Sequence, residues 1–375
     1  MRKAILIGYV DHYAIRIKHI EQYFIKNGYS VETVSSWFDH ATKERKSIKR
    51  DNQILIHCRS YSKNISASRV LSLLDFAFGV RKYLKKHNPD VIYAMLPPNC
   101  VAPVVARYAK KQGCKLIFDI LDMWPESMPS RILKKIKPMY YGWQSLRDRY
   151  LNAADVIFSE CKLYMDMLAD KSFAAKMRLL YLAKEDVALE RRPQLRKDVL
   201  SFCYLGSINN IIDAKGIAHL VKELRQYKPV EIHIIGGGEN KETFIAGLTQ
   251  AGAKVKDHGM LYDAAKKQAI FDQCHFGINM MKDMVCVGLT MKSIDYLRAG
   301  LPLLNSIKGD TEALVVNKGC GINVNPSLQA CVAQIIHTDA AEFINMRENA
   351  RTAFTSLFKS DVIAAEITSV LSNIV

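Results

Sequence analysis

The sequence has 375 residues, of which 49% are hydrophobic, and its 53 Lys and Arg outnumber its 37 Asp and Glu to give a formal net charge of +16 at pH 7. This length exceeds that of one typical domain and predicts two globular domains of about 150–200 residues each. No apolar run approaches the roughly 20 residues that span a bilayer, and the stretch before Asp11 has too few apolar residues for a secretory signal, so we expect neither.

The positive charge is concentrated in the first half of the chain. Residues 1–190 contain 32 Lys and Arg against 19 Asp and Glu, whereas residues 191–375 contain 21 against 18. Such a field attracts an anionic partner, which could be nucleic acid, a phosphorylated substrate or an acidic membrane surface.

Cysteine and histidine spacing gives no sign of a metal centre. The nine cysteines are scattered without a CxxC pair, which favours reduced thiols over a disulfide framework or a zinc site. The ten histidines include no HExxH and no other i, i+4 pair. We therefore expect no metal site built from protein side chains.

The first half alternates strand and helix patterns. Buried-strand patterns occur at 3–8, 29–36, 52–58, 90–96, 114–121 and 154–160, and amphipathic helix patterns at 16–28, 67–87, 99–113 and 134–152. We expect the strand at 154–160 to be the last of this half. The alternation predicts parallel strands joined by right-handed crossovers, which form a doubly wound α/β domain.

The same pattern restarts after a charged stretch at 185–198, which we interpret as a linker. Strands are predicted at 200–207, 230–238, 254–259, 276–281, 301–306 and 319–325, and helices at 214–227, 240–252, 263–274 and 291–300, before two C-terminal helices. We therefore predict an α/β fold of two Rossmann-like doubly wound domains that face a cleft. Their expected bounds are 1–188 and 199–355, and the helical segment 356–375 could pack back on the first domain.

The stretch MVCVGLTMKSIDYL at 284–297 is the strongest candidate site, because ligands bind at the carboxyl ends of strands in such sheets. Gly288, Leu289 and Thr290 would present free amides at a helix N-terminus, where the helix dipole favours anions. Lys292 adds a full positive charge, and Asp295 follows on the same face and would suit hydroxyl groups. The alternative is a surface ion pair between Lys292 and Asp295 worth only ~0.3 kcal/mol.

Two glycine-containing turns also follow strands of the second half. Gly236 and Gly237 lie in IIGGGEN, where backbone amides could approach a phosphate, although a tight turn without a ligand explains them equally well. Gly206 permits close approach after the preceding strand, and Lys215 near the next helix start could reach a diphosphate. A lysine in that place is more often a solvated charge.

In the first half, FDILDMWPES at 118–127 contains two acids. Asp122 lies just beyond a strand, where a carboxylate could serve as a base or bind substrate hydroxyls. For Asp119, which lies inside the apolar strand, we expect the structural role of capping buried backbone amides.

A basic, aromatic helix and a basic loop extend this first half. The segment 134–151 mixes cations with tyrosines and Trp143, as does a peripheral helix on an anionic bilayer, but we expect Trp143 to pack on its own domain. The loop at 42–50 is a solvated basic segment that could add to a membrane-facing field.

Together these segments resemble a GT-B glycosyltransferase, most closely the bacterial family 4 sugar-nucleotide transferases. FDILDMWPES is similar to that family's D-x-x-D-x-W-P-E segment, KSIDYLRAGLPLLNS to its K-x-x-E-Y-x-A-x-G-x-P-x-x-x-S segment, and KGCGINVN to the G-x-G stretch that follows. The sequence departs from the family at Val287, which replaces the first acid of its Glu–seven residues–Glu motif. It departs also at Leu121 and Ser207, which replace arginines.

The resemblance implies a nucleotide-sugar donor, uridine-linked by default, bound in the second domain. Lys292 and the helix amides would hold its diphosphate, and Asp295 its ribose. It also implies an acceptor in the first domain near Gly8, Asp11 and His12, retention of anomeric configuration, and no cofactor or bound metal.

With the basic first half, these features suggest transfer to a saccharide that is polyprenyl-diphosphate-linked, in cell-surface polysaccharide assembly at the cytoplasmic face of the membrane. Two alternatives remain open. A GT-B-fold nucleotide-sugar epimerase would act without an acceptor. A nucleic-acid-binding protein is suggested by charge alone, but no zinc-finger spacing or aromatic RNA-binding motif supports it, and we expect no nucleic-acid partner.

Overall fold

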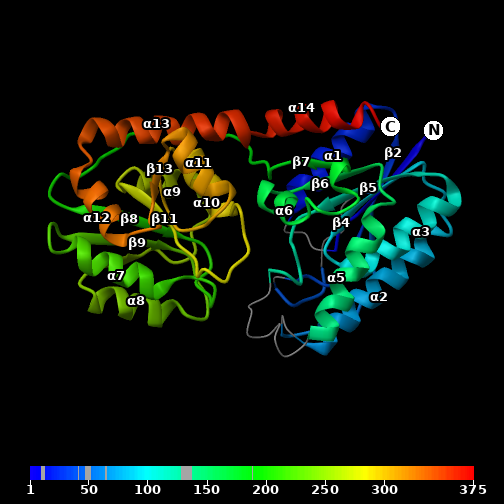
Figure 1. The fold of residues 1–375 in the computed structure, drawn as a ribbon, viewed down its shortest axis with the longest axis horizontal. Helices are drawn as coiled ribbons and strands as arrows, with labels where there is room; N and C mark the ends of the chain where they lie inside the picture. Colours follow the sequence, from blue (N-terminus) through cyan, green and yellow to red (C-terminus); the bar gives the residue numbers. More distant parts are fainter. Residues whose placement is uncertain (10–12, 41, 47–51, 64–65, 128–136, 188) are drawn as a thin grey trace. The chain divides into compact units, whose positions relative to one another are not determined.

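The computed structural model describes residues 1–9, 13–40, 42–46, 52–63, 66–127, 137–187 and 189–375. It divides the chain into two compact units. Unit 1 comprises Met1–Ala183 and Ser360–Val375, and unit 2 comprises Lys184–Lys359 (Figure 1). The acceptor candidates Asp11 and His12 lie outside the described residues.

Unit 1 contains a seven-stranded parallel sheet in the order β3-β2-β1-β4-β5-β6-β7. Its strands are Lys3–Ile7 (β1), Ser30–Ser36 (β2), Gln53–Ile56 (β3), Val91–Leu96 (β4), Lys115–Ile120 (β5), Val156–Ser159 (β6) and Met177–Leu179 (β7). The central strand β4 is buried along its whole length, as its apolar sequence VIYAML requires in a sheet covered on both faces.

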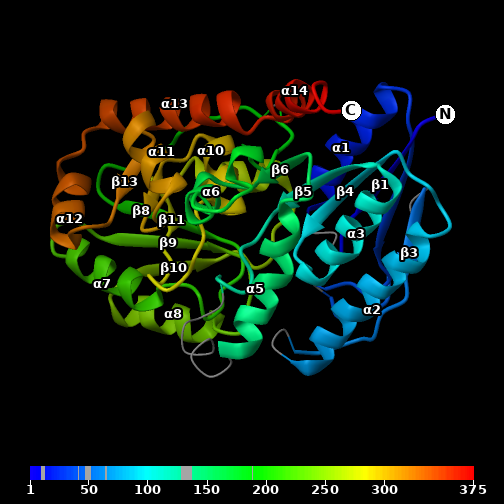
Figure 2. The ribbon, with the colours of Figure 1, turned by 45° about the vertical axis from the view of Figure 1, so that its right-hand side comes forward.

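Helices cover both faces of this sheet. They are Ala14–Lys26 (α1), Ala67–Leu84 (α2), Ala102–Gln112 (α3), Lys137–Leu151 (α5), Lys162–Met167 (α6) and Ser360–Leu371 (α14), with short 3-10 turns at Asn99–Val101 (η2) and Ala174–Lys176 (η3). Figures 1 and 2 show α2, α3 and α5 on one face and α1 and α14 on the other. The C-terminal helix α14 thus belongs to unit 1, where it packs on α1.

Unit 2 contains a six-stranded parallel sheet in the order β10-β9-β8-β11-β12-β13. Its strands are Leu200–Leu205 (β8), Val230–Ile235 (β9), Lys254–Asp257 (β10), Phe276–Asn279 (β11), Leu303–Asn305 (β12) and Gly321–Asn323 (β13). Strand order reverses beside β8, from which the chain runs first to β9 and β10 and later returns to β11. Ligands in open α/β sheets bind at the carboxyl ends of strands near such a reversal.

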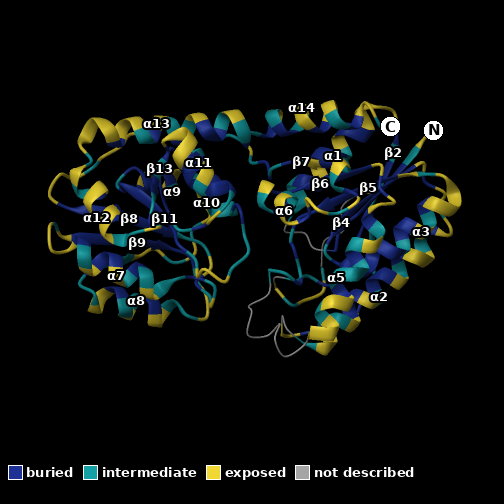
Figure 3. Cartoon of the chain, viewed as in Figure 1, coloured by how far each residue is buried: buried dark blue, intermediate teal, exposed yellow. Residues whose placement is uncertain are grey.

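Seven helices are described for unit 2. They are Ala214–Leu224 (α7), Lys241–Gln250 (α8), Ala264–Phe271 (α9), Met291–Ala299 (α10), Asp310–Lys318 (α11), Leu328–His337 (α12) and Ala340–Leu357 (α13). Helices α7 and α8 cover one face of the sheet, and α9, α10, α11 and α13 cover the other (Figures 1 and 2). The central strands form the buried core of each unit, whereas the outer helix faces are exposed (Figure 3).

The predicted fold class, two doubly wound parallel-sheet α/β units, is confirmed. Two details of the sequence prediction are wrong. The last strand of unit 1 is β7, not the segment 154–160, and three helices rather than two follow β13. The described residues of 185–198 contain no helix or strand, and the interpretation of this segment as a linker stays a prediction. A three-residue strand such as β7 is too short to show a periodic pattern, which is why the sequence did not reveal it.

Candidate functional site

The N-terminus of α10 lies at the carboxyl edge of the unit 2 sheet, after the loop that leaves β11. Helix α10 is held on the sheet by Tyr296, whose ring lies over Gly277 of β11. A Cβ atom at Gly277 would come within 2.5 Å of that ring, so only glycine allows this packing. The Tyr296 hydroxyl donates to the Cys203 carbonyl at 3.1 Å and accepts from the Leu205 amide at 2.7 Å. These contacts fix α10 over β8 and β11.

The first turn of α10 is capped at one amide and open at others. Thr290 is the N-cap residue, and its side chain accepts a hydrogen bond from the Ser293 amide at 3.2 Å. The amides of Met291 and Lys292 donate no hydrogen bond within the described part of the chain. Free amides at the positive end of a nine-residue helix form a place for an anion.

Lys292 brings a cation to this turn without a compensating acid. Its amine lies over the Tyr204 ring, 4.7 Å from the ring centroid, in a cation–π contact. Burial lowers the pKa of Lys292 from 10.5 to about 8, and no carboxylate of the described residues opposes this shift. Lys292 keeps some exposed surface, but its amine is desolvated enough that an anion placed beside it would be bound more strongly than one beside a solvated lysine.

Among the ion pairs of the described residues, none joins Asp295 to Lys292. The alternative of a surface ion pair between these two residues is therefore wrong. The Asp295 carboxylate instead accepts from Lys184 at 2.6 Å and lies 3.4 Å from Arg298. Burial lowers the pKa of Lys184, and the nearby Asp295 acts in the opposite direction. Sequence reasoning missed Lys184 because it lies 111 residues from Asp295. The predicted contact of Asp295 with a ribose stays a prediction.

The turns after β8 and β9 meet backbone to backbone. Gly236 has φ +148° and packs so closely that a Cβ atom there would lie 2.0 Å from the Gly206 carbonyl oxygen. The Ile208 amide donates to the Gly237 carbonyl at 2.8 Å. Gly236 therefore has a structural reason to be glycine without any ligand, as the tight-turn interpretation held.

Gly206 differs, because its φ of +113° also requires glycine but a Cβ atom there would meet nothing within 4 Å. A ligand could therefore approach its backbone. Lys215 is exposed in the first turn of α7, after the Asp213 cap, and it forms no ion pair with the described residues. Contacts of these residues, and of Gly236 and Gly237, with a donor stay predictions.

The loop before α10 is anchored to α11. The Gly288 carbonyl accepts from the Thr311 amide at 2.9 Å and from its hydroxyl at 2.7 Å, while Leu289 is buried. Gly288 and Leu289 therefore fix the path of the chain into Thr290. Their own amides donate no hydrogen bond within the residues that the structure places, as the anion-site prediction requires.

In unit 1, Asp122 lies just beyond β5, and burial raises the pKa of its carboxyl while a hydrogen bond from Ser127 lowers it. Asp119 is fully buried and pairs with Arg16 at 3.2 Å, and it accepts a hydrogen bond from the Tyr93 hydroxyl. The predicted capping of backbone amides by Asp119 is therefore wrong, although its role is structural as expected. A buried guanidinium pairs with the carboxylate instead.

Gly8 and Trp143 of unit 1 are both buried. Gly8 directly follows β1, and its amide donates to the Val34 carbonyl at 3.0 Å; a Cβ atom there would lie 3.1 Å from the Met95 sulfur. Trp143 stacks edge-on against Trp124 with ring centroids 5.1 Å apart, as predicted for packing within its own domain. The acceptor role of Gly8 stays a prediction.

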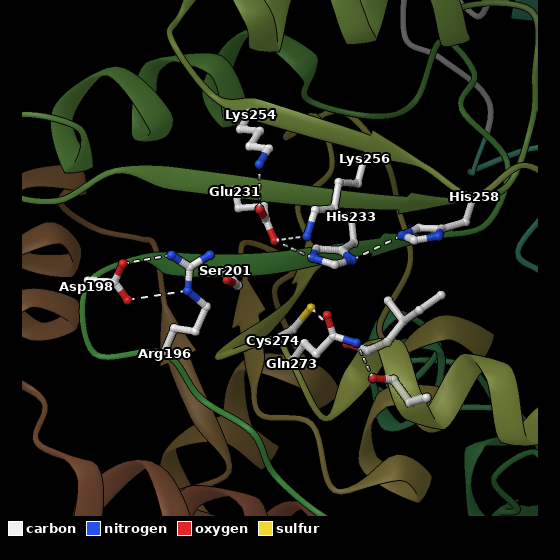
Figure 4. A network of polar contacts seen from close by, with 12 residues as sticks. Arg196, Asp198, Ser201, Glu231, His233, Lys254, Lys256, His258, Gln273 and Cys274 are labelled. Carbon is white, nitrogen blue, oxygen red and sulfur yellow. Dashed lines mark hydrogen bonds and ion pairs between the residues drawn. The ribbon is translucent and has the colours of Figure 1, made fainter.

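A second polar cluster in unit 2 lies on β9, on β10 and at His258, which directly follows β10 (Figure 4). Glu231 accepts from Lys256 at 2.6 Å and contacts His233 at 2.9 Å, and His233 reaches His258 at 3.0 Å. Burial lowers the pKa of both histidines. The cluster joins the edge strand β10 to β9, the strand that leads into the Gly236 turn, and we interpret the cluster as structural.

Two further searches bear on the class of site. Within the described ranges, no group of three or more His, Cys, Asp or Glu is placed to hold a metal ion. Among the helices that the structure describes, none is long and apolar enough to cross a membrane.

Comparison with known proteins gives a match in structure but not in sequence. No protein-family model and no curated protein matches the sequence. The fold of sucrose-phosphate synthase from Thermosynechococcus elongatus matches with a TM-score of 0.72 at 15% identity, covering 100% of this chain and 99% of that one. The lipopolysaccharide outer core galactosyltransferase WaaB matches with a TM-score of 0.71 at 14% identity over 100% of both chains. HepE of Anabaena, in complex with UDP and glucose, gives 0.67 at 14% identity over 100% of both chains.

These matched structures are GT-B glycosyltransferases. The chain therefore has the GT-B fold, as its resemblance to that class implied.

Proposed function

We propose that the protein is a glycosyltransferase that takes a hexosyl group from a nucleoside-diphosphate sugar. The observation that carries the proposal is Lys292, a desolvated cation beside free helix amides at the carboxyl edge of the unit 2 sheet. That arrangement suits a diphosphate. The GT-B fold supports the proposal, as do the HepE structures with UDP and with UDP-glucose.

In this mechanism, Lys292 and the amides of the α10 first turn bind the diphosphate of the donor. As the glycosidic bond breaks, negative charge grows on the departing diphosphate, and these groups stabilise it without having to reorient. Because the pKa of Lys292 is about 8, the amine is mostly protonated at pH 7, and a bound diphosphate raises that pKa again. Asp295, oriented by Lys184, accepts hydrogen bonds from ribose hydroxyls, and anomeric configuration is retained.

The acceptor is proposed to be a saccharide bound at the carboxyl edge of the unit 1 sheet. Asp122 lies there, and its raised pKa brings the carboxyl closer to the range in which it can accept a proton from an attacking hydroxyl. Gly8 lies at the same edge, because parallel strands β1 and β5 end on one side of the sheet.

An anionic membrane surface is the proposed second partner, consistent with a polyprenyl-diphosphate-linked acceptor in polysaccharide assembly at the cytoplasmic face. The outward face of α2 supports this. Leu71, Leu74 and Phe78 are 40%, 44% and 56% exposed along one helix stripe. Arg81 and Lys82 continue the same exposed face toward its C-terminal end. A helix with apolar and basic residues on its exposed face suits the interface of an anionic bilayer.

The catalytic proposal is tested by titrating the protein with UDP, ADP and GDP and by assaying sugar release from the matching nucleotide-sugars with lipid-linked saccharide acceptors. We expect binding of a nucleoside diphosphate and acceptor-dependent transfer. Epimerisation or hydrolysis that needs no acceptor would instead favour the epimerase alternative. Salt-dependent DNA binding without nucleotide binding would sink the transferase.

The membrane proposal is tested by flotation with vesicles that contain phosphatidylglycerol and with neutral vesicles. Each Lys or Arg near an anionic surface contributes about 1 kcal/mol, so replacing Arg81 and Lys82 by serine should lower partitioning about thirtyfold. Lys26→Ser, an exposed cation on α1, is the matched control. Equal binding to neutral vesicles, or no response to the double replacement, would refute the α2 surface.

A further inference from the structure

Three side chains at the start of α10 form a closed ring of hydrogen bonds. The Asn279 amide nitrogen donates to the Ser293 hydroxyl at 2.9 Å. The Ser293 and Thr290 hydroxyls lie 2.6 Å apart, and the Thr290 hydroxyl donates to the Asn279 side-chain oxygen at 3.1 Å. The Ser293 oxygen accepts from Asn279, and the Thr290 proton is donated to Asn279. The Ser293 hydroxyl proton is therefore the one that lies between Ser293 and Thr290, and it points to Thr290. Every bond therefore runs in one direction around the ring.

Two of the three ring residues are fully buried, and the third, Thr290, is half-buried. Asn279 and Ser293 have no exposed surface. The Thr290 hydroxyl oxygen accepts from the Ser293 hydroxyl and from the Ser293 backbone amide, so the ring includes the N-cap bond of α10. Bonds that run head to tail polarise one another, and a buried network in which each donor has an acceptor holds one geometry. The ring thus fixes the orientation of the first turn.

The network continues across the ends of two more strands. The second Asn279 proton goes to the Asn305 side-chain oxygen at 3.0 Å, and Asn305 in turn donates to Asn323 at 2.8 Å. These three asparagines occupy matched positions at the ends of the neighbouring strands β11, β12 and β13. Asn323 donates to the Glu312 carbonyl of α11 at 3.1 Å. Since α11 also holds the Gly288 carbonyl, the start of α10 is anchored from both sides.

We infer that Asn279, Ser293 and Thr290 are positioning residues that hold the α10 first turn in its anion-binding geometry. The inference rests on the proposed function for the identity of the anion, a nucleoside diphosphate. The three residues act on the ligand through the free amides and through Lys292, which sits between Thr290 and Ser293 in the chain. With the ring intact, Lys292 is confined over Tyr204 in a poorly hydrated place. With the ring broken, the turn gains freedom and water reaches the amine.

The experiment compares Thr290→Val with Thr290→Ser, because valine keeps the shape of threonine without its hydroxyl and serine keeps the hydroxyl. Ser293→Ala breaks the ring at a second point. Ser201→Ala is the matched control, since Ser201 is a buried serine of the same sheet outside the ring. Three quantities are measured for each: the Kd of UDP by calorimetry, the pKa of the Lys292 amine in the free protein by NMR of labelled lysine, and the Tm.

We expect Thr290→Val and Ser293→Ala each to weaken UDP binding about tenfold, because each removes a hydrogen bond that holds the first turn. Each should also move the Lys292 pKa from about 8 toward its ordinary value. Thr290→Ser should keep both properties of the wild type, and Ser201→Ala should change at most the Tm. A purely structural ring would lower the Tm in both ring variants without changing the Kd or the Lys292 pKa, and that result would overturn the inference.

The failures of the two proposals are distinguishable. If wild-type protein binds no nucleoside diphosphate, the proposed function fails, but the Lys292 pKa in the free protein still tests the ring. If UDP binds and the pKa stays near 8 in both ring variants, the positioning role is wrong while the transferase stands.

Discussion

Replacing Lys292 by methionine should stabilise the free protein while abolishing donor binding. Burial lowers the Lys292 pKa from 10.5 to about 8, which is about 2.5 pKa units or ~3.4 kcal/mol of unfavourable free energy for the charged amine in the folded state. Methionine fills similar space without charge but loses the contact with the Tyr204 ring, worth about 1 kcal/mol. The net expectation is a gain of ~2 kcal/mol in the free energy of unfolding at pH 7.

The pH dependence gives this prediction a second signature. The folded-state pKa of Lys292 lies below the unfolded value, so the unfolded chain binds more protons between pH 8 and 10.5, and wild-type stability rises with pH in that window. Lys292→Met should lack this rise. UDP affinity of the wild type should fall above pH 8, as the amine loses its proton.

The assay is hydrogen exchange of α10 peptides, compared between variant and wild type at pH 7 and pH 9, together with UDP calorimetry. Lys222→Met, at an exposed lysine of α7, is the matched control and should change neither stability nor binding. The reasoning would be refuted if Lys292→Met were less stable than the wild type at pH 7, or if it still bound UDP with near wild-type affinity.

Three further predictions follow from other contacts of unit 2. Asp295→Asn leaves the desolvated Lys184 without its acidic partner, so the free energy of unfolding in urea should fall by ~1–3 kcal/mol and glycosyl transfer should fall as well. An unchanged urea midpoint would contradict the pairing. Burial lowers the pKa of His275 to about 4, against ~6.5 when unfolded, so stability present above pH 6.5 should be lost as pH falls toward 4, by up to ~3.4 kcal/mol. In calorimetry, the stability of a His275→Gln variant should fall less steeply toward acid pH than that of the wild type. An equally steep fall would exclude His275 as the group responsible. Gly236→Ala would bring a Cβ atom to 2.0 Å from the Gly206 carbonyl, so the Tm of this variant should fall by several degrees. An unchanged Tm would show that the two turns can separate.

The fold could be predicted because its information is local. Strand and helix patterns alternate along most of the chain, and parallel strands with helical crossovers have few allowed topologies. The predictions failed where the pattern was short or ambiguous. Strand β7 has only three residues, which is too few to show a strand pattern.

The helix start at the candidate site was predicted from the sequence, whereas the roles of its residues stay predictions. The sequence identified Lys292, Asp295 and the helix start at Thr290, since glycine, a cap residue and a cation follow one another there. It gave the wrong alternative partner for Asp295, because an acid three residues from a lysine looks like a local ion pair. The structure brings Lys184 to Asp295 instead, over a separation of 111 residues.

The sequence by itself determined the two parallel α/β units and the helix that begins beside Lys292, because periodicity, caps and glycines act through neighbours along the chain. Only the tertiary structure decided that Lys292 is desolvated, that Asn279 closes a ring with Ser293 and Thr290, and that α11 holds the turn from its other side. Burial and hydrogen-bond geometry depend on which distant segments meet, and that is set by packing of the whole unit rather than by any short stretch of residues.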